Sequence, residues 1–204
     1  MHSSLDLPKR EDTECSEQTY RNYRPFRAPC SERPFYLVKI FESKIMETQN
    51  EIKIRSFAPS DLKAVKELIE KTVDTNYKDF FCREIMEYFG QFHGDVNVLQ
   101  VAIKGYAVVA EKGDKILGTG SLIDDYILRV YVDPACQKQG VGKMIMAVLE
   151  KLASARGKKK VRLRATDISK SYYQKLGYVT IEKNLEGVEN GKELVYYLME
   201  KQIG

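Results

Sequence analysis

The chain has 204 residues, of which 43% are hydrophobic and 30% charged, and its formal net charge of +4 is mild. This composition is typical of a globular protein. The mild positive charge suits an anionic ligand such as a cofactor phosphate, but it does not by itself indicate nucleic acid. A membrane protein is disfavoured because no apolar run approaches the ~18 residues of a span, and four widely spaced cysteines without a C-x-x-C pair favour neither a disulfide framework nor zinc.

The segment 1–49 differs in composition from the rest and is predicted to be an extension. It precedes a predicted domain over 50–204, whose length is typical of one domain. Its first nine residues are polar and lack the apolar core of a signal peptide, so a cytoplasmic location is expected. Only Phe35 to Phe41 has the composition of a strand or short helix. Three interpretations stay open: a flexible extension, sequence upstream of a natural start at Met46, or an arm that binds a partner.

Regular structure is predicted from Ile52, where apolar and polar residues alternate as in a strand. A helix is expected to open at Ser60-Asp61, because the apolar residues after it share one helical face. These residues are Leu62, Val65, Leu68, Ile69 and Val73. A second helix is predicted from Asp79 to Phe89, and Gly90 and Gly94 are predicted to bracket a loop that holds His93.

Three strands are predicted next, over 106–111, 116–123 and 126–132. A long helix follows from about Gly140 to Arg156, and Gly157 is a typical helix stop. The remaining predicted elements are a strand over 161–165, a helix over 169–176, and strands over 178–182 and 194–199. This order predicts an α/β (α+β) domain with a mixed sheet.

The most informative segment is the strand, turn and helix from Ile127 to Gly142. A helix N-terminus has unpaired backbone N–H groups and a partial positive charge, so it attracts phosphate. Gly140 and Gly142 let the backbone approach a bulky anion closely, and Lys138 and Lys143 add positive charge.

Two well-known phosphate loops do not fit these residues. A P-loop needs G-x-x-x-x-G-K-[ST], but Gln137 stands at the first glycine and Met144 at the hydroxyl. A dinucleotide fingerprint G-x-G-x-x-G begins at Gly140 and fails at Ile145. The turn therefore matches neither of these phosphate-binding motifs.

The turn QKQGVG over 137–142 matches Q/R-x-x-G-x-G/A and resembles the cofactor-binding signature of the GNAT (GCN5-related) N-acetyltransferase superfamily. The preceding LRVYVDP over 128–134 is similar to that family's central strand, and SYYQKLGY over 171–178 is similar to its F-Y-x-K-x-G-F/Y segment. The order of predicted elements from Ile52 to Met199 also agrees, so the resemblance covers about three-quarters of the chain. It implies the GNAT fold, with a mixed sheet of about six or seven strands flanked by about four helices.

The resemblance also implies a function: transfer of an acetyl group from acetyl-CoA to a primary amine, by direct attack within a ternary complex. The main chain of Val130, Tyr131 and Val132 would pair with the pantetheine arm, and an N–H near Val130 would polarise the thioester carbonyl. The backbone N–H groups of the turn would hold the CoA pyrophosphate: Gln137, Lys138, Gln139, Gly140, Val141, Gly142 and Lys143. Tyr173 would be the general acid for the departing thiolate, and its alternative is a tyrosine packed against the sheet. Because the reference pKa is ~10 for tyrosine and ~8.5 for a thiol, the acid role needs close geometry.

Two positions depart from the family pattern. Leu128 stands where many relatives carry a carboxylate that acts as general base, and Thr166 stands where relatives often have asparagine. Asp124 and Asp125 lie just upstream and either act through water or only form the turn. His93 has a suitable reference pKa, with a surface histidine as its alternative. The general base is therefore left unassigned.

The expected partner is an amine-bearing substrate, either a small molecule or a protein amine, with no membrane and no metal, and the resemblance allows a homodimer. The regions 74–96 and 184–192 are predicted to select the acceptor. The missing carboxylate motivates an alternative function, a non-catalytic CoA-binding, regulatory or partner-binding module. Nucleic-acid binding through 20–27 is a third and less favoured hypothesis.

Overall fold

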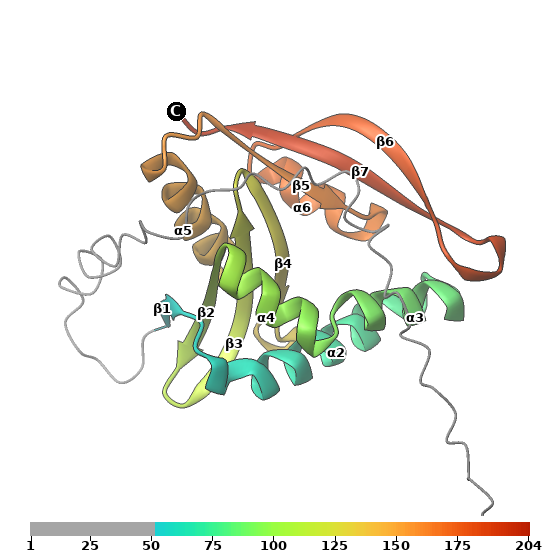
Figure 1. Cartoon of the computed structure of the whole chain (residues 1–204), viewed down its shortest axis with the longest axis horizontal. Coiled ribbons are helices and arrows are strands. Elements are labelled where there is room, and N and C mark those ends of the chain that lie inside the picture. The colour runs from blue at the N-terminus through green and yellow to red at the C-terminus, as the bar shows by residue number, and fades with distance from the viewer. Residues whose placement is uncertain (1–51) are drawn as a thin grey trace, which may run out of the picture. The chain divides into compact units, whose positions relative to one another are not determined.

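The computed structural model describes residues 52–204 (Figure 1), so the predicted extension and the arginine-tyrosine stretch at 20–27 lie outside the described residues. One seven-stranded sheet has the order β1-β2-β3-β4-β5-β7-β6. Among the described strands, only β4 and β5 pair in parallel, and the other neighbours are antiparallel, which confirms the predicted mixed sheet. The strands are β1 (Lys53–Ser56), β2 (Tyr106–Lys112), β3 (Lys115–Ile123), β4 (Tyr126–Val132), β5 (Lys160–Ala165), β6 (Val179–Gly187) and β7 (Glu193–Gln202).

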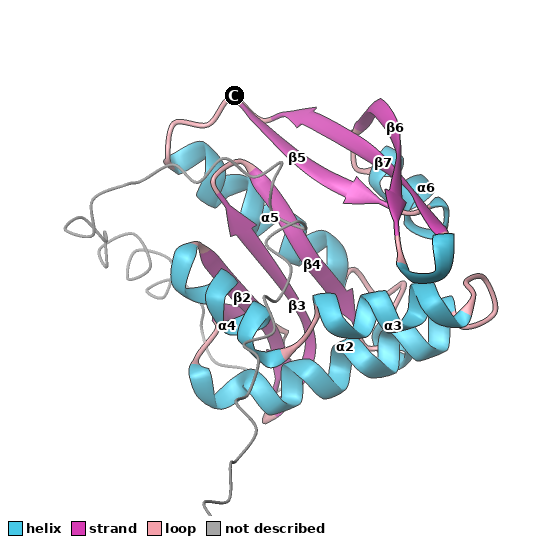
Figure 2. Cartoon of the chain, turned by 45° about the vertical axis from the view of Figure 1, so that its right-hand side comes forward, coloured by secondary structure: helices cyan, strands magenta, loops and turns pink. Residues whose placement is uncertain are grey.

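Helices cover both faces of the sheet (Figure 2). The α-helices of the described chain are α2 (Leu62–Tyr77), α3 (Arg83–Phe92), α4 (Asp95–Lys104), α5 (Val141–Ala155) and α6 (Asp167–Lys175). Short 3₁₀ turns are η2 (Pro59–Asp61), η3 (Pro134–Cys136) and η4 (Glu189–Gly191). None of the described helices combines the length and the apolar character needed to cross a membrane.

The predicted loop around His93 is wrong. Gly90 lies inside α3, His93 caps the end of that helix, and α4 begins directly after Gly94. A glycine is tolerated in α3 because the helix buries Ile85 and Phe89 against the rest of the protein, and this packing offsets the weak helix propensity of glycine.

Two hydrophobic cores lie on opposite faces of the sheet. The first is centred on α5, where Ile145 and Leu149 are fully buried, and the second lies under α2 and α3 and includes Ile69 and Phe89. Helix α5 approaches β3 closely because β3 carries glycine at 118 and 120. A β-carbon at Gly120 would lie only 2.5 Å from the Cγ2 atom of Ile145.

A β-bulge interrupts the pairing of β4 with β3. Thr119 pairs with Tyr131 and Ser121 pairs with Leu128, so two β4 residues oppose a single residue of β3. One of the two, Arg129, has a φ of 55°. A bulge bends its strand and increases the local twist. Consistent with this bend, β4 pairs with β5 only at Tyr126 and Arg162, and the two strands then diverge (Figure 2).

Candidate functional site

The glycine turn leads directly into α5. Gly140 is the residue before the helix and has a φ of 88°, and Lys138 has a φ of 61°. The first hydrogen bond of the helix runs from Met144 N–H to Gly140 C=O, at 3.0 Å. The N–H groups of the first helical residues therefore have no partner within the helix, and they lie next to the exposed residues 138–140.

Buried Asp133 fixes the start of this turn. Its carboxylate accepts the N–H of Ala135 at 3.0 Å, the Nζ of Lys71 lies 2.9 Å away, and the Nζ of Lys115 lies 3.4 Å away. The hydrogen bond from Lys71, followed by those from Ala135 and Lys115, holds the pKa of Asp133 below its usual value despite burial. The side chain of Asp133 thus ties η3 to β3 and α2 just before the glycine turn.

The first residue of the motif, Gln137, has a structural role in this arrangement. Its Nε2 donates to the carbonyl of Val132 at 3.1 Å, and Thr72 Oγ1 lies 3.3 Å from the same carbonyl. Asp133 N–H donates to Leu117 C=O of the neighbouring strand at 2.9 Å. Because main-chain groups alternate in direction along an antiparallel strand, those of Tyr131 face β3 and those of Val132 face the side where β5 diverges.

The turn, the end of β4 and α6 meet at Gly142. A β-carbon there would lie 2.7 Å from the hydroxyl oxygen of Tyr172 and 3.6 Å from the Cγ2 atom of Val132. Tyr172 is partly exposed, and burial, followed by the nearby charge of Glu150, raises the pKa of its hydroxyl to about 12. The tyrosine that touches the turn is therefore Tyr172, next to the predicted acid Tyr173.

Tyr173 is 8% exposed and belongs to the core under α5. Its ring lies 5.1 Å from that of Tyr172 and 5.9 Å from that of Tyr178. Burial raises the pKa of Tyr173, and the negative charges that Tyr77 and Tyr172 would carry if ionised raise it further. The pKa of Tyr131 rises well above its usual value because of burial, with Tyr77 and Tyr173 as further causes. Hydroxyls from α2, β4 and α6 are therefore near enough to interact electrostatically, and each keeps its proton at neutral pH.

His93 is buried, not a surface residue, with 7% of its area exposed. Its Nε2 lies 2.7 Å from the hydroxyl oxygen of Tyr131. Burial, followed by the charge of Arg129, lowers the pKa of His93 to about 3. A general base works best when its pKa is near the working pH, so a neutral, buried His93 does not fit that role. The sequence offered no sign of this contact, because the two residues lie 38 positions apart.

The side chain of Arg129 stabilises the β-bulge in β4. Arg129 is 6% exposed, its Nη2 donates to the carbonyl of Phe92 at 3.0 Å, and its guanidinium lies 4.8 Å from the centre of the Phe92 ring. A non-glycine residue with positive φ needs compensating contacts. Both Arg129 and Tyr131 thus connect β4 to the end of α3.

Both aspartates upstream of β4 have structural partners. Asp125 is 8% exposed and accepts two hydrogen bonds from Arg162, at 2.8 and 2.9 Å. Asp124 has a φ of 54° and pairs with Lys158. These contacts favour the turn interpretation over action through water. Leu128 and the rest of β4 supply no carboxylate.

The two regions predicted to select the acceptor lie side by side. Helix α3 contacts η4, in the connection between β6 and β7 (Figure 1). A hydrogen bond from Glu84's own main chain, followed by one from Cys82, lowers the pKa of the Glu84 carboxyl, and the charge of Lys192 acts in the same direction. The core under α2 and α3 also includes Val188 from this connection.

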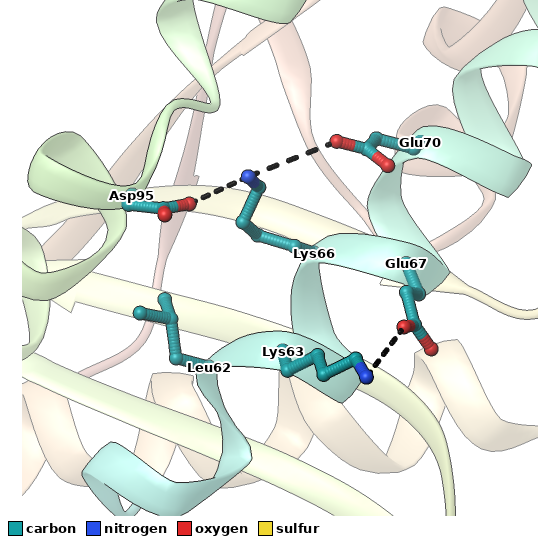
Figure 3. Close-up of a pocket in the computed structure, with 6 residues that line it drawn as sticks. All are labelled: Leu62, Lys63, Lys66, Glu67, Glu70 and Asp95. Carbon is teal, nitrogen blue, oxygen red and sulfur yellow. Dashed lines mark ion pairs between the residues drawn. The ribbon is translucent and has the colours of Figure 1, made fainter.

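A separate hollow lies on the outer surface of α2 and the start of α4 (Figure 3), and none of the predicted cofactor-binding or catalytic residues lines it. The Nζ atom of Lys66 lies 2.6 Å from a carboxylate oxygen of Asp95 there, so the charges that line the hollow largely compensate one another. Its lining residues are Leu62, Lys63, Lys66, Glu67, Glu70 and Asp95. Over residues 52–204, no group of three or more His, Cys, Asp or Glu side chains is arranged to hold a metal ion.

The profile of the family described as an acetyltransferase (GNAT) domain matches residues 73–201. A comparison with curated protein sequences finds no significant match. Solved structures are similar in fold. A GCN5-related N-acetyltransferase from Rhodopseudomonas palustris has a TM-score of 0.69 at 23% identity, with 77% of this chain and 99% of that one covered.

Two further structures were solved with a ligand. The PaiA N-acetyltransferase from Thermoplasma acidophilum, in complex with coenzyme A, has a TM-score of 0.59 at 19% identity, with 74% of this chain and 99% of that one covered. A Salmonella typhimurium protein with its cofactor acetyl-CoA has a TM-score of 0.55 at 19% identity, with 76% and 95% covered. At these identities the likeness concerns the fold alone.

Proposed function

The chain belongs to the GNAT acetyltransferase family, and from that premise we propose that it moves the acetyl group of acetyl-CoA to a primary amine within a ternary complex. One observation carries the proposal: the glycine turn at the start of α5 lies beside the C-terminal end of β4, which is not paired with β5 because the two strands pair only at Tyr126 and Arg162. Val132 and Gly142 meet there. An anion site and an unpaired strand edge are together what a cofactor with a pyrophosphate and an amide-bearing arm requires.

The cofactor roles follow from this placement. The N–H groups from Gln137 to Lys143 bind the pyrophosphate, with Gly140 and Gly142 permitting the close approach. The pantetheine arm follows β4 from Val130 to Val132 on the side where β5 diverges. A likeness to structures that hold coenzyme A or acetyl-CoA supports the choice of cofactor.

In the reaction, the amine nitrogen attacks the thioester carbonyl, a C–N bond forms, and the C–S bond breaks. The amine loses one proton to solvent, and the sulfur leaves as a thiolate. We assign Tyr173 as the hydroxyl that donates to this thiolate. Because burial raises the pKa of Tyr173, full proton transfer to a thiolate is uphill. Tyr173 therefore stabilises the thiolate mainly through a hydrogen bond.

A second candidate function has its own observation. β4 carries Leu128 where a carboxylate would serve as base, and the nearby His93 is neutral. A non-catalytic CoA-binding module would need neither group. Such a protein binds acetyl-CoA but transfers nothing.

The test uses the full chain and acetyl-CoA in two measurements. Calorimetry measures acetyl-CoA binding, and a thiol-release assay measures turnover with a panel of spermidine, amino-acid amides and a lysine-containing peptide. Binding with amine-dependent thiol release, and an acetylated amine found by mass spectrometry, supports the transferase. Binding without turnover on the whole panel supports the second candidate, and absence of binding rejects both.

A further inference from the structure

The hydroxyl of Tyr172, on α6, lies where the glycine turn leads into α5. It is 2.7 Å from the position of a β-carbon on Gly142, and the same position is 3.6 Å from the Cγ2 atom of Val132 at the end of β4. Tyr172 is 36% exposed, and residues 138–140 of the turn and Lys143 after it are exposed as well. A ligand that reaches the turn from solvent can therefore also reach this tyrosine.

Helix geometry places this hydroxyl beside the N–H groups that the turn presents. In an α-helix every Cα–Cβ bond tilts toward the N-terminus, so a group at the β-carbon position of Gly142 lies toward the N-terminal end of α5. The N–H groups of the first helical residues point out of that same end and have no partner within the helix. Tyr172 thus adds a side-chain O–H to a set of main-chain donors.

The hydroxyl of Tyr172 is available as a hydrogen-bond donor. The hydroxyl of Tyr178 donates to Glu150 at 2.9 Å, whereas no hydrogen bond within residues 52–204 uses that of Tyr172. Burial, followed by the charge of Glu150, raises the pKa of Tyr172 to about 12. The side chain therefore keeps its proton at neutral pH, and it can donate to an anion instead of repelling it as a phenolate would.

We propose that the O–H of Tyr172 donates a hydrogen bond to the phosphate that carries the pantetheine arm of the acetyl donor, and that glycine at 142 makes room for it. That phosphate is the one nearest to the end of β4, which the arm follows. The inference rests on the proposed acetyl transfer and adds a side-chain ligand to the main-chain donors. The motifs that the chain resembles have phenylalanine at 172 and glycine or alanine at 142, so the resemblance does not imply this contact.

The first test uses the full chain and acetyl donors of decreasing length. Tyr172→Phe should raise the Kd for acetyl-CoA, measured by calorimetry, about tenfold, because it removes a hydrogen bond to a charged acceptor. In the thiol-release assay it should lower kcat/KM similarly for S-acetyl phosphopantetheine, which keeps one phosphate, and by less than about twofold for S-acetylpantetheine, which keeps none. Tyr197→Phe is the matched control, since its hydroxyl donates to Asp167 of α6 at 2.8 Å, and it should leave all three constants unchanged.

The second test uses the space that the two residues share. A β-carbon at Gly142 would lie 2.7 Å from the hydroxyl oxygen of Tyr172, but its next neighbour, the Cζ atom of the same ring, is at an ordinary contact distance of 3.4 Å. Without ligand, Gly142→Ala should therefore lower the Tm of the parent but not that of Tyr172→Phe, where the favourable helix propensity of alanine remains. Together the two changes should weaken acetyl-CoA binding by less than the product of their separate effects, because both remove the same hydroxyl from its place.

Two results would reject the contact with phosphate. They are a Kd for acetyl-CoA within about twofold of the parent in Tyr172→Phe, and an equal loss of kcat/KM with S-acetylpantetheine. Fully independent effects of Tyr172→Phe and Gly142→Ala on both Tm and Kd would reject the role assigned to glycine at 142. A parent chain that binds acetyl-CoA but acetylates no amine rejects the proposed function instead, and the calorimetric comparison of Tyr172→Phe with Tyr197→Phe still decides the role of Tyr172.

Discussion

The hydroxyl oxygen of Tyr172 lies 2.7 Å from the position that a β-carbon on Gly142 would occupy. A real β-carbon does not come that close to another heavy atom, so the tyrosine occupies space that exists only because position 142 has no side chain. Helix α6 thereby contacts the first turn of α5. Two motifs that were connected only by their spacing in the sequence are neighbours in space.

Gly142→Ala should weaken acetyl-CoA binding about tenfold, equivalent to about 1.4 kcal/mol. The added methyl displaces Tyr172 and occupies the approach to the N–H groups of the turn. Calorimetry measures the change. Gly90→Ala is the matched control, since nothing lies within 4 Å of its added carbon, and it should leave binding unchanged while stabilising α3 by up to about 1 kcal/mol. Unchanged affinity in Gly142→Ala would contradict the assignment of the turn.

Tyr173→Phe should lower kcat about a hundredfold, the usual size of a lost hydrogen bond to charge that develops in the transition state, while the Kd for acetyl-CoA changes little. The hydroxyl is removed but the ring still fills its place in the core. The thiol-release assay measures kcat, and calorimetry measures the Kd for acetyl-CoA. Tyr106→Phe on β2 is the control, a partly buried tyrosine whose ring lies 5.0 Å from the guanidinium carbon of Arg156. Equal losses in kcat and in binding would argue for a packing role of Tyr173.

Asp125→Asn should reduce the free energy of unfolding by about 1–3 kcal/mol, because it weakens a two-point charged hydrogen bond to Arg162. It should leave kcat unchanged. Urea denaturation and the thiol-release assay test the two halves of this expectation. Asp114→Asn, in the exposed β2–β3 turn, is the control for losing a turn carboxylate. A large fall in kcat with normal stability would instead identify Asp125 as a base acting through water.

The stabilising contribution of Asp133 should disappear in acid. Its pKa in the folded chain is lowered, first by Lys71, below the value of ~3.9 expected in the unfolded chain. A lowered pKa gives stability that is fully present above the unfolded pKa and is lost as the pH falls through the folded pKa. Urea denaturation should therefore show Asp133→Asn less stable than the parent near pH 7 and almost equal to it near pH 2. A difference that persists undiminished in acid would show that packing, not charge, is responsible.

The main architecture could be predicted because most elements carry regular patterns. The exception is α4, whose sequence is rich in valine and isoleucine, residues with weak helix propensity. Val98 and Val101 are buried while Val96 and Ile103 are each 66% exposed. The apolar residues of α4 thus do not reveal which face is inside, and contacts with β2 and β3 decide that the segment is a helix.

The hairpin of β6 and β7 was underestimated for a related reason. The predicted strands ended at 182 and began at 194, but the ladder continues from Asn184 opposite Tyr196 to Gly187 opposite Glu193. Most of β6 is exposed, so burial imposes no alternation on its sequence. Cross-strand pairing supports the strand, and pairing leaves little trace in one strand alone.

The residues of the candidate site also fall into two groups, those that local motifs predict and those that only the fold brings together. The turn residues and Tyr173 could be proposed from local motifs. The contacts of His93 with Tyr131 and of Arg129 with Phe92 join segments that are distant in the chain. Nothing in the sequence LRVYV indicates a bulge, because the positive φ of Arg129 is stabilised by tertiary contacts with α3.

The single pair between β4 and β5, Tyr126 with Arg162, makes a seam through the sheet. Strands β1 to β4 lie on one side of the seam and β5, β7 and β6 on the other, and α5 contacts both sides. Weakly joined parts of a protein can open separately, so amides of β5 and β7 should exchange with solvent on a different timescale from those of β2 and β3. A molecule that spans the seam would couple the two parts, and the cooperativity of unfolding would then report whether the protein is loaded.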